Sequence, residues 1–271
     1  MSENQTHPNA VDEALDKLLT YTFGQSREPL ALIEKQVLAS LGDRSKEAGL
    51  AEKLVQRLRI DASTDCKNFV CRQLGLLNQS GAIDSILGLL DHPETADHAL
   101  FALERIDQPA VLEGLQKALE TAPEKSRVGI LLVLGKKKNP GSIPAISSYV
   151  QDKNPDCSEA AIRALGMIGG ASACEELKKA EYARSPQIHR AWGNSLLQIA
   201  EGFRASGDQP HSTAILQPLL ASEHPFGIRK AALLGLKNSD KKSFEDALAG
   251  ILSEPDGKLK HLAQQMKDSS D

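Results

Sequence analysis

The chain has 271 residues, of which 41% are apolar and only 4% aromatic, and its formal net charge is −4. Leu and Ala dominate the apolar set, which favours closely packed helices over a β-sandwich or barrel rich in Val, Tyr and Trp. The acidic balance argues against a dedicated nucleic-acid binder, because such proteins usually carry a basic domain or stripe.

The first nine residues are polar and lack the apolar core of a signal peptide, and no run of 18 apolar residues occurs in the chain. We therefore expect a cytoplasmic protein without a membrane anchor. An exported chain whose leader had been removed would show the same pattern.

The first helical patterns, at 10–23, 29–42 and 45–60, are looser than those that follow. They predict an N-terminal cap or degenerate repeat over residues 1–64.

A pattern of about 30 residues recurs from Cys66 onward. Its landmarks are Cys66, Thr95, Ser126, Cys157, Ile188 and Ile228. Each landmark is followed eight residues later by a leucine: Leu74, Leu103, Leu134, Leu165, Leu196 and Leu236. The first five landmarks are spaced by 29 or 31 residues, and the sixth comes 40 residues later because of an insertion around Glu201–Gln209. Self-similarity at such a period is typical of helical repeat arrays.

The landmark segments are interpreted as the second helix of each repeat. The residue four before each Leu is also apolar, at Val70, Ala99, Ile130, Ala161, Trp192 and Ala232. Counted from the repeat Leu as 0, positions −8, −4 and 0 form one apolar stripe, as a period of 3.6 residues requires. Gly follows the Leu at Gly75, Gly135 and Gly166, where a missing side chain lets a neighbouring helix approach closely.

Shorter first helices are predicted between them, at 82–90, 110–119, 142–150, 173–182, 213–220 and 244–252. Several joints place a capping residue before Pro, as in Asn139-Pro140, Asn154-Pro155 and Ser185-Pro186, and Pro at the first helical position loses no hydrogen bond. The joint Asp91-His92-Pro93 is also interpreted as a helix start. A charged final helix at 258–267 and a polar tail complete a continuous repeat array over residues 65–271.

The repeat segments resemble HEAT repeats, in the short bacterial form also called PBS-lyase HEAT-like repeats. CSEAAIRALGMIG (157–169) and IRKAALLGLK (228–237) resemble the second helix of that family, and SGAIDSILGLLDHPE (80–94) resembles its first helix and exit turn. The resemblance implies an all-α, right-handed α-solenoid whose second helices line a concave face. It also implies a protein–protein scaffold. Trp192 departs from the family's small residue at position −4, so we expect the helix stacking to differ locally there.

Some proteins with HEAT-like repeats are enzymes, and their activity requires particular residues. The deoxyhypusine hydroxylase type holds two irons with repeated His-Glu pairs, but Glu follows none of the histidines, which are His7, His92, His98, His189, His211, His224 and His261. No HExxH motif or other metal-ligand spacing occurs. We therefore expect no catalytic residue, cofactor or metal. A bilin-lyase-like accessory role remains an alternative, supported by the repeat alone.

Positions −5 and −2 of the second helices are expected to project into the binding groove. The predicted partner-binding residues there and beside them are Phe69, Arg72, His98, Phe101, Leu132, Arg163, Arg190 and Asn194. Aromatic and Arg anchors in an apolar patch are typical of protein interfaces. The other interpretation is that the helix register differs and these residues belong to the core. The partner is predicted to be a protein or peptide.

A nucleic-acid groove like that of alkylpurine glycosylases is the second alternative. Lys136, Lys137 and Lys138 would then contact phosphates, although a lysine run is more often a solvated rim. The negative net charge argues against this alternative. The cysteines, Cys66, Cys71, Cys157 and Cys174, form no CxxC pair, so we expect buried free thiols.

Overall fold

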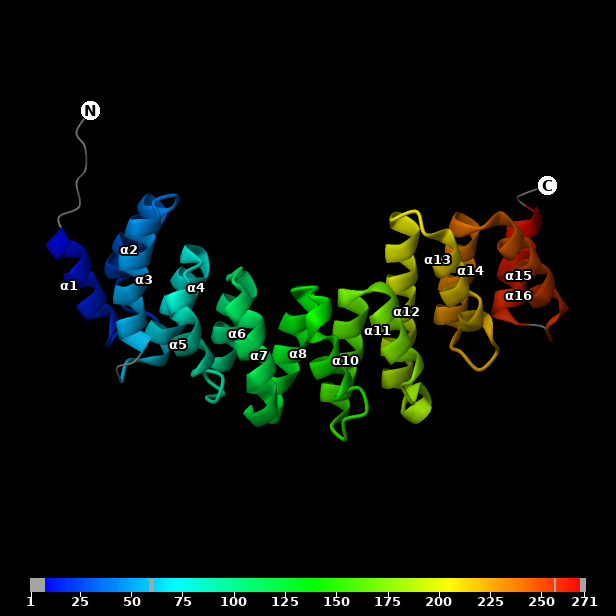
Figure 1. Cartoon of the computed structure of the whole chain (residues 1–271), viewed down its shortest axis with the longest axis horizontal. Helices are drawn as coiled ribbons and strands as arrows, with labels where there is room; N and C mark the ends of the chain where they lie inside the picture. The colour runs from blue at the N-terminus through cyan, green and yellow to red at the C-terminus, as the bar shows by residue number, and fades with distance from the viewer. Residues whose placement is uncertain (1–7, 59–60, 256, 269–271) are drawn as a thin grey trace, which may run out of the picture. The chain divides into compact units, whose positions relative to one another are not determined.

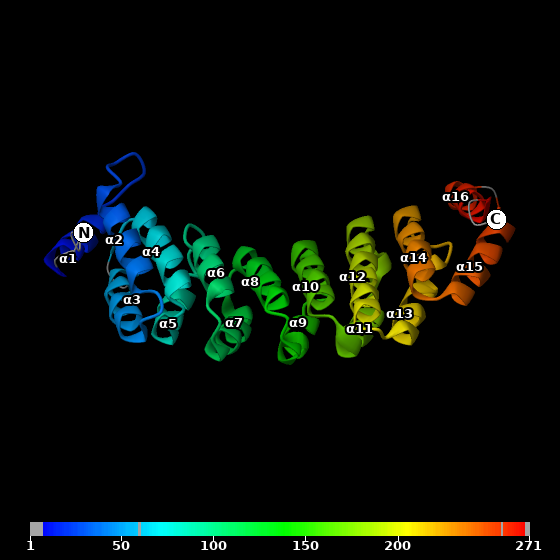
Figure 2. The same ribbon diagram turned by 90° about the horizontal axis from the view of Figure 1, so that it is seen from above.

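The computed structural model describes residues 8–58, 61–255 and 257–268 (Figure 1). Every regular element within these ranges is a helix. The chain divides into two compact units, Met1–Leu134 and Gly135–Asp271, and each is described by itself. In each unit the first helices form one row and the second helices another (Figure 2). The predicted all-α solenoid of helix-turn-helix repeats is thereby confirmed.

Unit 1 begins with α1 (Pro8–Leu18), α2 (Glu28–Ser40) and α3 (Arg44–Leu58), which correspond to the three predicted N-terminal helices. α1 ends earlier than predicted, because the chain turns after Leu18 and reaches Gly24 with a positive φ of 98°. The predicted residues 59–60 of the third helix lie outside the described residues. So do residues 1–7, with His7, and the end of the polar tail.

The regular repeats of unit 1 follow directly. Their helices are α4 (Thr64–Leu77), α5 (Ile83–Leu87) behind a 3₁₀ turn at Ser80–Ala82, α6 (Ala96–Arg105), α7 (Pro109–Thr121) and α8 (Glu124–Lys136). α3 packs directly against α4, so the predicted N-terminal cap (residues 1–64) lies in the same unit as the first repeats. The N-terminal helices and the first repeats therefore form one packed body.

Unit 2 continues the alternation of short first helices and longer second helices. Its helices are α9 (Ile143–Ser147), α10 (Pro155–Ile168), α11 (Gly170–Lys178), α12 (Pro186–Ala205), α13 (Gln209–Leu216), α14 (Phe226–Ser239), α15 (Lys241–Ser253) and α16 (Lys258–Asp268). Three 3₁₀ turns accompany them, at Pro140–Ser142, Tyr182–Arg184 and Pro218–Leu220. The predicted final helix at 258–267 is α16.

The helix starts follow the predicted capping chemistry. Asn154 Oδ1 accepts from Asp156 N at 2.9 Å, and Ser185 Oγ accepts from Ile188 N at 3.1 Å. Pro occupies the first helical position after each cap, as it does in the 3₁₀ turn after Asn139. The interpretation of His92-Pro93 as a helix start is wrong. α6 begins at Ala96, since the chain first forms a turn in which His92 O accepts from Thr95 N at 3.0 Å.

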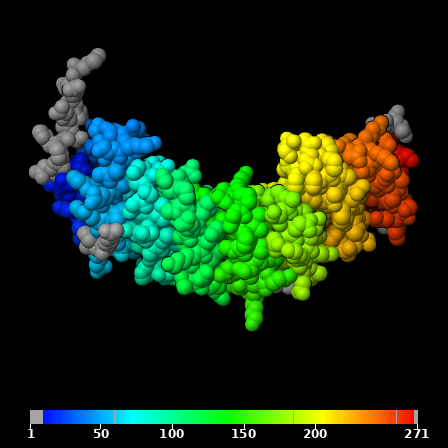
Figure 3. Space-filling model, in the orientation of Figure 1, coloured from blue at the N-terminus to red at the C-terminus, as the bar shows by residue number. Residues whose placement is uncertain are grey.

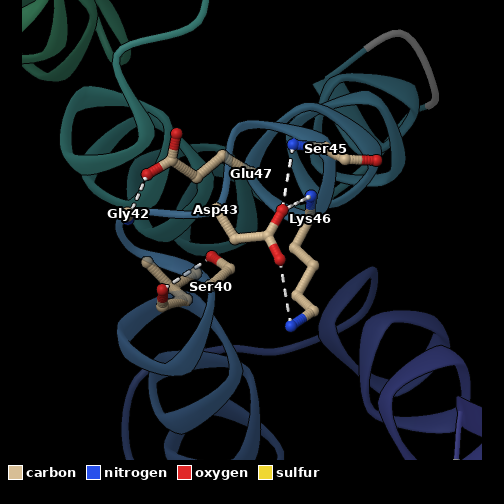
Figure 4. A network of polar contacts seen from close by, with 7 residues as sticks. Ser40, Gly42, Asp43, Ser45, Lys46 and Glu47 are labelled. Carbon is tan, nitrogen blue, oxygen red and sulfur yellow. Dashed lines mark hydrogen bonds and ion pairs between the residues drawn. The ribbon is translucent and has the colours of Figure 1, made fainter.

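The turn between α2 and α3 shows in detail how side chains cap the start of a helix (Figure 4). Asp43 Oδ1 accepts from Ser45 N and Lys46 N, each at 3.2 Å, and Asp43 Oδ2 lies 3.0 Å from Lys46 Nζ. The hydrogen bond from the Lys46 side chain lowers the pKa of Asp43. Glu47 Oε1 accepts from Gly42 N at 2.8 Å, so the donors at the start of α3 are satisfied from both sides.

The apolar stripe of the second helices forms the core of each unit. The repeat leucines are all buried, and Val70, Ala99, Ile130 and Ala161 at position −4 are fully so. Burial of each such Leu stabilises the fold by about 1.5–3 kcal/mol relative to an exposed side chain. Side chains of successive hairpins fill the space between the ribbons of each unit (Figure 3).

Buried hydroxyls complete the polar bonding between rows. Ser126 Oγ donates to Leu90 O at 2.7 Å, and Thr95 Oγ1 donates to Leu89 O at 3.0 Å. Both carbonyls follow a short first helix, and the Leu89 carbonyl also accepts from His92 N at 3.3 Å. The hydroxyls at the landmark positions therefore fix the first row to the second.

The glycines after the repeat leucines lie where neighbouring second helices touch, as predicted. A Cβ added to Gly75 would lie 3.3 Å from Ala102 Cα, one added to Gly135 would lie 2.6 Å from Ala164 Cα, and one added to Gly166 would lie 2.7 Å from Ser195 Cβ. Each glycine at position +1 thus faces a small residue at position −1 of the next second helix.

The insertion predicted around Glu201–Gln209 lengthens a helix rather than forming a loop. α12 continues to Ala205 and has 20 residues. An ion pair between Glu201 and Arg204 supports its last turn, and the Phe203 ring stacks on His211 of α13 with centroids 5.0 Å apart. Gly207, with φ of 84°, then reverses the chain.

We predict that Gly166→Ala destabilises unit 2 by about 1–3 kcal/mol, because its Cβ forces α10 and α12 apart. The matched control is Gly250→Ala in α15, where an added Cβ would meet nothing within 4 Å. It should stabilise the helix by about 0.5–1 kcal/mol. Urea denaturation followed by the fluorescence of Trp192, the single tryptophan, measures both. Equal stability of Gly166→Ala and the wild type would contradict the close-contact argument.

Candidate functional site

The exposed positions of the second helices follow one another at four-residue intervals. Position −2 is exposed at Arg72, Phe101, Arg163 and Asn194 and half-buried at Leu132. Positions −6 and +2 lie one turn before and after it on the same helix face. We call positions −6, −2 and +2 together the exposed stripe. Position −2 is thus accessible to solvent in these repeats, and the binding of a partner there stays a prediction.

The prediction that position −5 projects outward is wrong for Phe69. Its side chain is only 2% exposed and belongs to the core of unit 1. Position −5 lies on the flank that faces the preceding second helix, as the contact between Gly129 and Leu100 shows. His98 at the equivalent position of α6 is half-buried. Neither residue is part of the exposed stripe.

Unit 1 carries an apolar and cationic patch on its stripe, made of Arg72, Leu76, Phe101 and Arg105, which we call the unit 1 patch. Phe101 is 40% exposed and Leu76 48% exposed. Arg105 Cζ lies 4.0 Å from the centroid of the Phe101 ring, a cation–π distance. The Arg105 guanidinium therefore covers one face of the ring and holds the patch in order.

Unit 2 carries a groove between α10 and α12, which we call the α10–α12 groove. Its volume is ≈ 430 Å³, and it brings together three of the predicted residues, Arg163, Arg190 and Asn194. Arg163 pairs with Glu159 at 3.5 Å. Met167, Gln187 and Gln198 complete most of the lining. Such a set offers two cations, three carboxamides and an apolar thioether to a ligand.

Sequence reasoning missed the residues at position +2. Leu76, Arg105, Met167 and Gln198 all extend the stripe by one helical turn beyond position −2. Their signal was the four-residue spacing itself, which applies to the outward face as it does to the core. Glu159 was missed for the same reason, at position −6.

Four rings gather in the fifth repeat, where Trp192 takes the place of the small residue at position −4. They belong to Tyr182, His189, Trp192 and His224. The Trp192 ring stacks on Tyr182 with centroids 4.1 Å apart, and its Nε1 donates to Leu177 O at 2.8 Å. His189 Nε2 lies 2.9 Å from His224 Nδ1, so a single proton joins α12 to the turn before α14. Trp192 belongs to the core, and the local difference in helix stacking stays a prediction.

Burial keeps both histidines of this cluster neutral. It lowers the pKa of His189 and of His224, and Glu223 opposes the shift in each case. The nearby Arg229 and the partner imidazole lower the pKa of His224 further. A shared proton between two neutral rings is therefore the stable arrangement near neutral pH.

The four cysteines are buried free thiols, as predicted. Burial raises the pKa of Cys66 to about 11 and that of Cys71 to about 12. Neither thiol is a ready nucleophile. In the described part of the chain, no three His, Cys, Asp or Glu side chains gather as metal ligands would. None of its helices combines the length and apolar character needed to cross a membrane.

These features define an α-solenoid repeat protein with an exposed row of polar and apolar side chains on its second helices. Residues 115–198 match the family model of HEAT repeats. This part of the chain, residues 115–198, therefore carries HEAT-like repeats. HEAT repeats suggest a scaffold for protein interactions.

The solved structures that match the chain are only distantly similar to it. The complex of CpcE and CpcF of phycocyanin lyase from Nostoc sp. PCC7120 is 17% identical, with a TM-score of 0.41 over 92% of this chain and 96% of that chain. An engineered protein is 19% identical, with a TM-score of 0.42 over 92% of this chain and 75% of that chain. Human deoxyhypusine hydroxylase in complex with glycerol is 16% identical, with a TM-score of 0.37 over 96% and 95%. No curated protein matches the sequence.

We predict that unit 2 loses stability as the pH falls below about 6.5, the pKa of an unfolded histidine. The unfolded chain then binds protons that the buried pair resists, so the loss continues until His189 and His224 are protonated in the folded state. Urea midpoints read from Trp192 fluorescence at pH 7.5 and 5.5 measure it. The double variant His189→Gln/His224→Gln should lose much of this pH dependence, and the exposed control His92→Gln should retain it. An unchanged slope in the double variant would refute the assignment.

Proposed function

We propose that the chain is a non-catalytic scaffold that binds a protein or peptide partner along the exposed stripe of its second helices. The observation that carries the proposal is the α10–α12 groove. Its carboxamides, from Gln187, Asn194 and Gln198, can each donate to and accept from a peptide backbone. A groove lined in this way suits an extended segment of a partner.

The charges of the groove select the partner's side chains. Arg190 forms no ion pair among the described residues, whereas Arg163 is shared with Glu159. An Arg fork can bind a carboxylate through two parallel hydrogen bonds. An acidic side chain on the partner would therefore dock at Arg190, and an apolar one would lie against Met167.

The unit 1 patch supports the same function by other means. Phe101 beneath Arg105 and the neighbouring Leu76 offer an ordered apolar contact with a cationic edge. Aromatic and Arg side chains in such patches carry most of the affinity in measured interfaces. The residues lining the α10–α12 groove include only one carboxylate and no His or Cys, which favours binding over proton transfer or nucleophilic catalysis.

We predict that Arg163→Glu/Arg190→Glu weakens the partner complex at least about tenfold, which corresponds to about 1.4 kcal/mol. The purified chain is cross-linked in a lysate of its native host, and the partner that it captures is then titrated by calorimetry. The matched control, Lys117→Glu/Lys153→Glu, makes the same charge change at exposed sites outside the groove. Equal affinities for both variants and the wild type would reject the α10–α12 groove as the binding site.

The nucleic-acid alternative gives a different result in a gel-shift assay. DNA binding would weaken steeply with added salt and would be lost when Lys136, Lys137 and Lys138 are replaced by Glu. We expect no shift at low salt, because the chain is acidic overall. A salt-sensitive shift that these substitutions abolish would replace the protein-binding proposal.

A further inference from the structure

A second groove lies at the last hairpin of unit 2, and its lining residues are outside the exposed stripe already described. α16 packs against both α14 and α15, and the three helices can be located in Figure 2. Residues of these helices line a groove of ≈ 570 Å³. Its lining is Lys237, Lys241, Phe244, Glu245, Leu248, Ala249, Leu252 and Lys267. We call it the terminal groove.

The floor of the terminal groove is one flank of α15. Phe244, Leu248 and Leu252 follow at four-residue intervals and form an apolar ridge along that helix. Phe244 and Leu248 are only 7% and 8% exposed and form the bottom of the groove, whereas Leu252 is half-buried and Ala249 is exposed. The lining from Lys241 to Leu252 spans about 17 Å at 1.5 Å per residue, which is about three helical turns.

This flank is the place where another first helix would stack. First helices pack side by side along each row, as Leu87 of α5 does against Gly114 of α7. α15 has such a neighbour on its other side, where Ser243 Oγ accepts from Gln217 Nε2 at 3.2 Å. Within the described residues no first helix covers the flank that carries Ala249 and Leu252. The groove is therefore shaped for a helix.

The rim of the terminal groove is cationic in an acidic chain. Three lysines and one glutamate give it a net charge of +2, whereas the whole chain carries −4. Lys241 forms an ion pair with Glu245, with 3.8 Å between Lys241 Nζ and Glu245 Oε1. Lys237 and Lys267 form no ion pair among the described residues, and they come from different helices. Two different helices thus supply cations beside the apolar residues of α15.

We propose that the terminal groove binds an amphipathic α-helix of a partner protein, with an apolar stripe flanked by acidic residues. Leu side chains spaced at i, i+3, i+4 and i+7 would lie against Phe244, Leu248 and Leu252. Glu or Asp residues beside them would face Lys237, Lys241 and Lys267. A single fatty-acid carboxylate would satisfy only one of these three lysines, so the charge distribution favours a helix with several acidic groups.

The test uses a fluorescein-labelled peptide of about 14 residues, three to four turns as the groove requires, with a helical Leu stripe flanked by Glu. Fluorescence anisotropy with the full chain should show saturable binding. A peptide with Lys in place of Glu, and one with Ser in place of Leu, should each bind at least about tenfold more weakly. Absence of saturable binding, or equal binding of the three peptides, would overturn the proposal.

Variants locate the binding on the chain. Lys241→Glu/Lys267→Glu should weaken the acidic peptide about tenfold, which is about 1.4 kcal/mol. The matched control Lys242→Glu, one residue away and outside the groove, should change it less than about twofold. Ala249→Glu should block the groove while leaving the core intact, as an unchanged urea midpoint from Trp192 fluorescence would verify. Unaltered affinity in both groove variants would overturn the assignment.

Two further measurements separate this proposal from other outcomes. Arg163→Glu/Arg190→Glu should leave binding of the acidic peptide unchanged, so failure of the α10–α12 groove and failure of the terminal groove are distinguishable. Sedimentation velocity over a range of protein concentrations tests self-association. A dimer that Ala249→Glu dissociates would show that a second copy of the chain occupies the groove, and would overturn the partner-helix proposal.

Discussion

The close approach of successive second helices is the constraint on which the rest of the structure depends. At Gly135 the next helix lies so near that a Cβ would come within 2.6 Å of Ala164 Cα. Contact at position +1 of one helix and −1 of the next fixes the rotation of both helices about their axes. That rotation buries positions −8, −4 and 0 and turns position −2 outward. The core and the exposed stripe therefore have a common cause, and a change in the contact would alter both.

The fifth repeat meets the same constraint with larger side chains. Trp192 replaces the small residue at position −4, and the space between rows is filled by its stacking on Tyr182 and by the pair of His189 and His224. Gly193 compensates beside it, because an added Cβ would lie 2.2 Å from Ile228 Cδ1. Aromatic packing of this kind retains the stack but makes it depend on the protonation of two imidazoles, the half-buried His189 and the buried His224. The free energy of unfolding of unit 2 thus includes a pH-dependent contribution from His189 and His224.

The periodicity of the sequence predicted most of the fold because core contacts in a repeat protein are local. Helices, caps and the glycine contacts all follow from spacings within about 30 residues. The wrong prediction for Phe69 shows the limit of such reasoning. Sequence spacing gives the angle of a residue around its helix, but it does not say which side of that helix a neighbouring helix covers. His189 and His224 are 35 residues apart, and the terminal groove draws on three helices. Neither could be found from local spacing, because each depends on how separate helices meet.

The charge distribution connects the three candidate surfaces. The chain is acidic, yet the unit 1 patch, the α10–α12 groove and the terminal groove each hold at least two Arg or Lys side chains beside apolar groups. Acidic surroundings repel other acidic chains at long range, whereas a desolvated cation beside an apolar contact attracts a carboxylate strongly at short range. Under the proposed binding function, a partner would combine an acidic group with an apolar one. Specificity would come from this pairing, because the packed repeats within each unit hold the cation and the apolar contact at a fixed spacing.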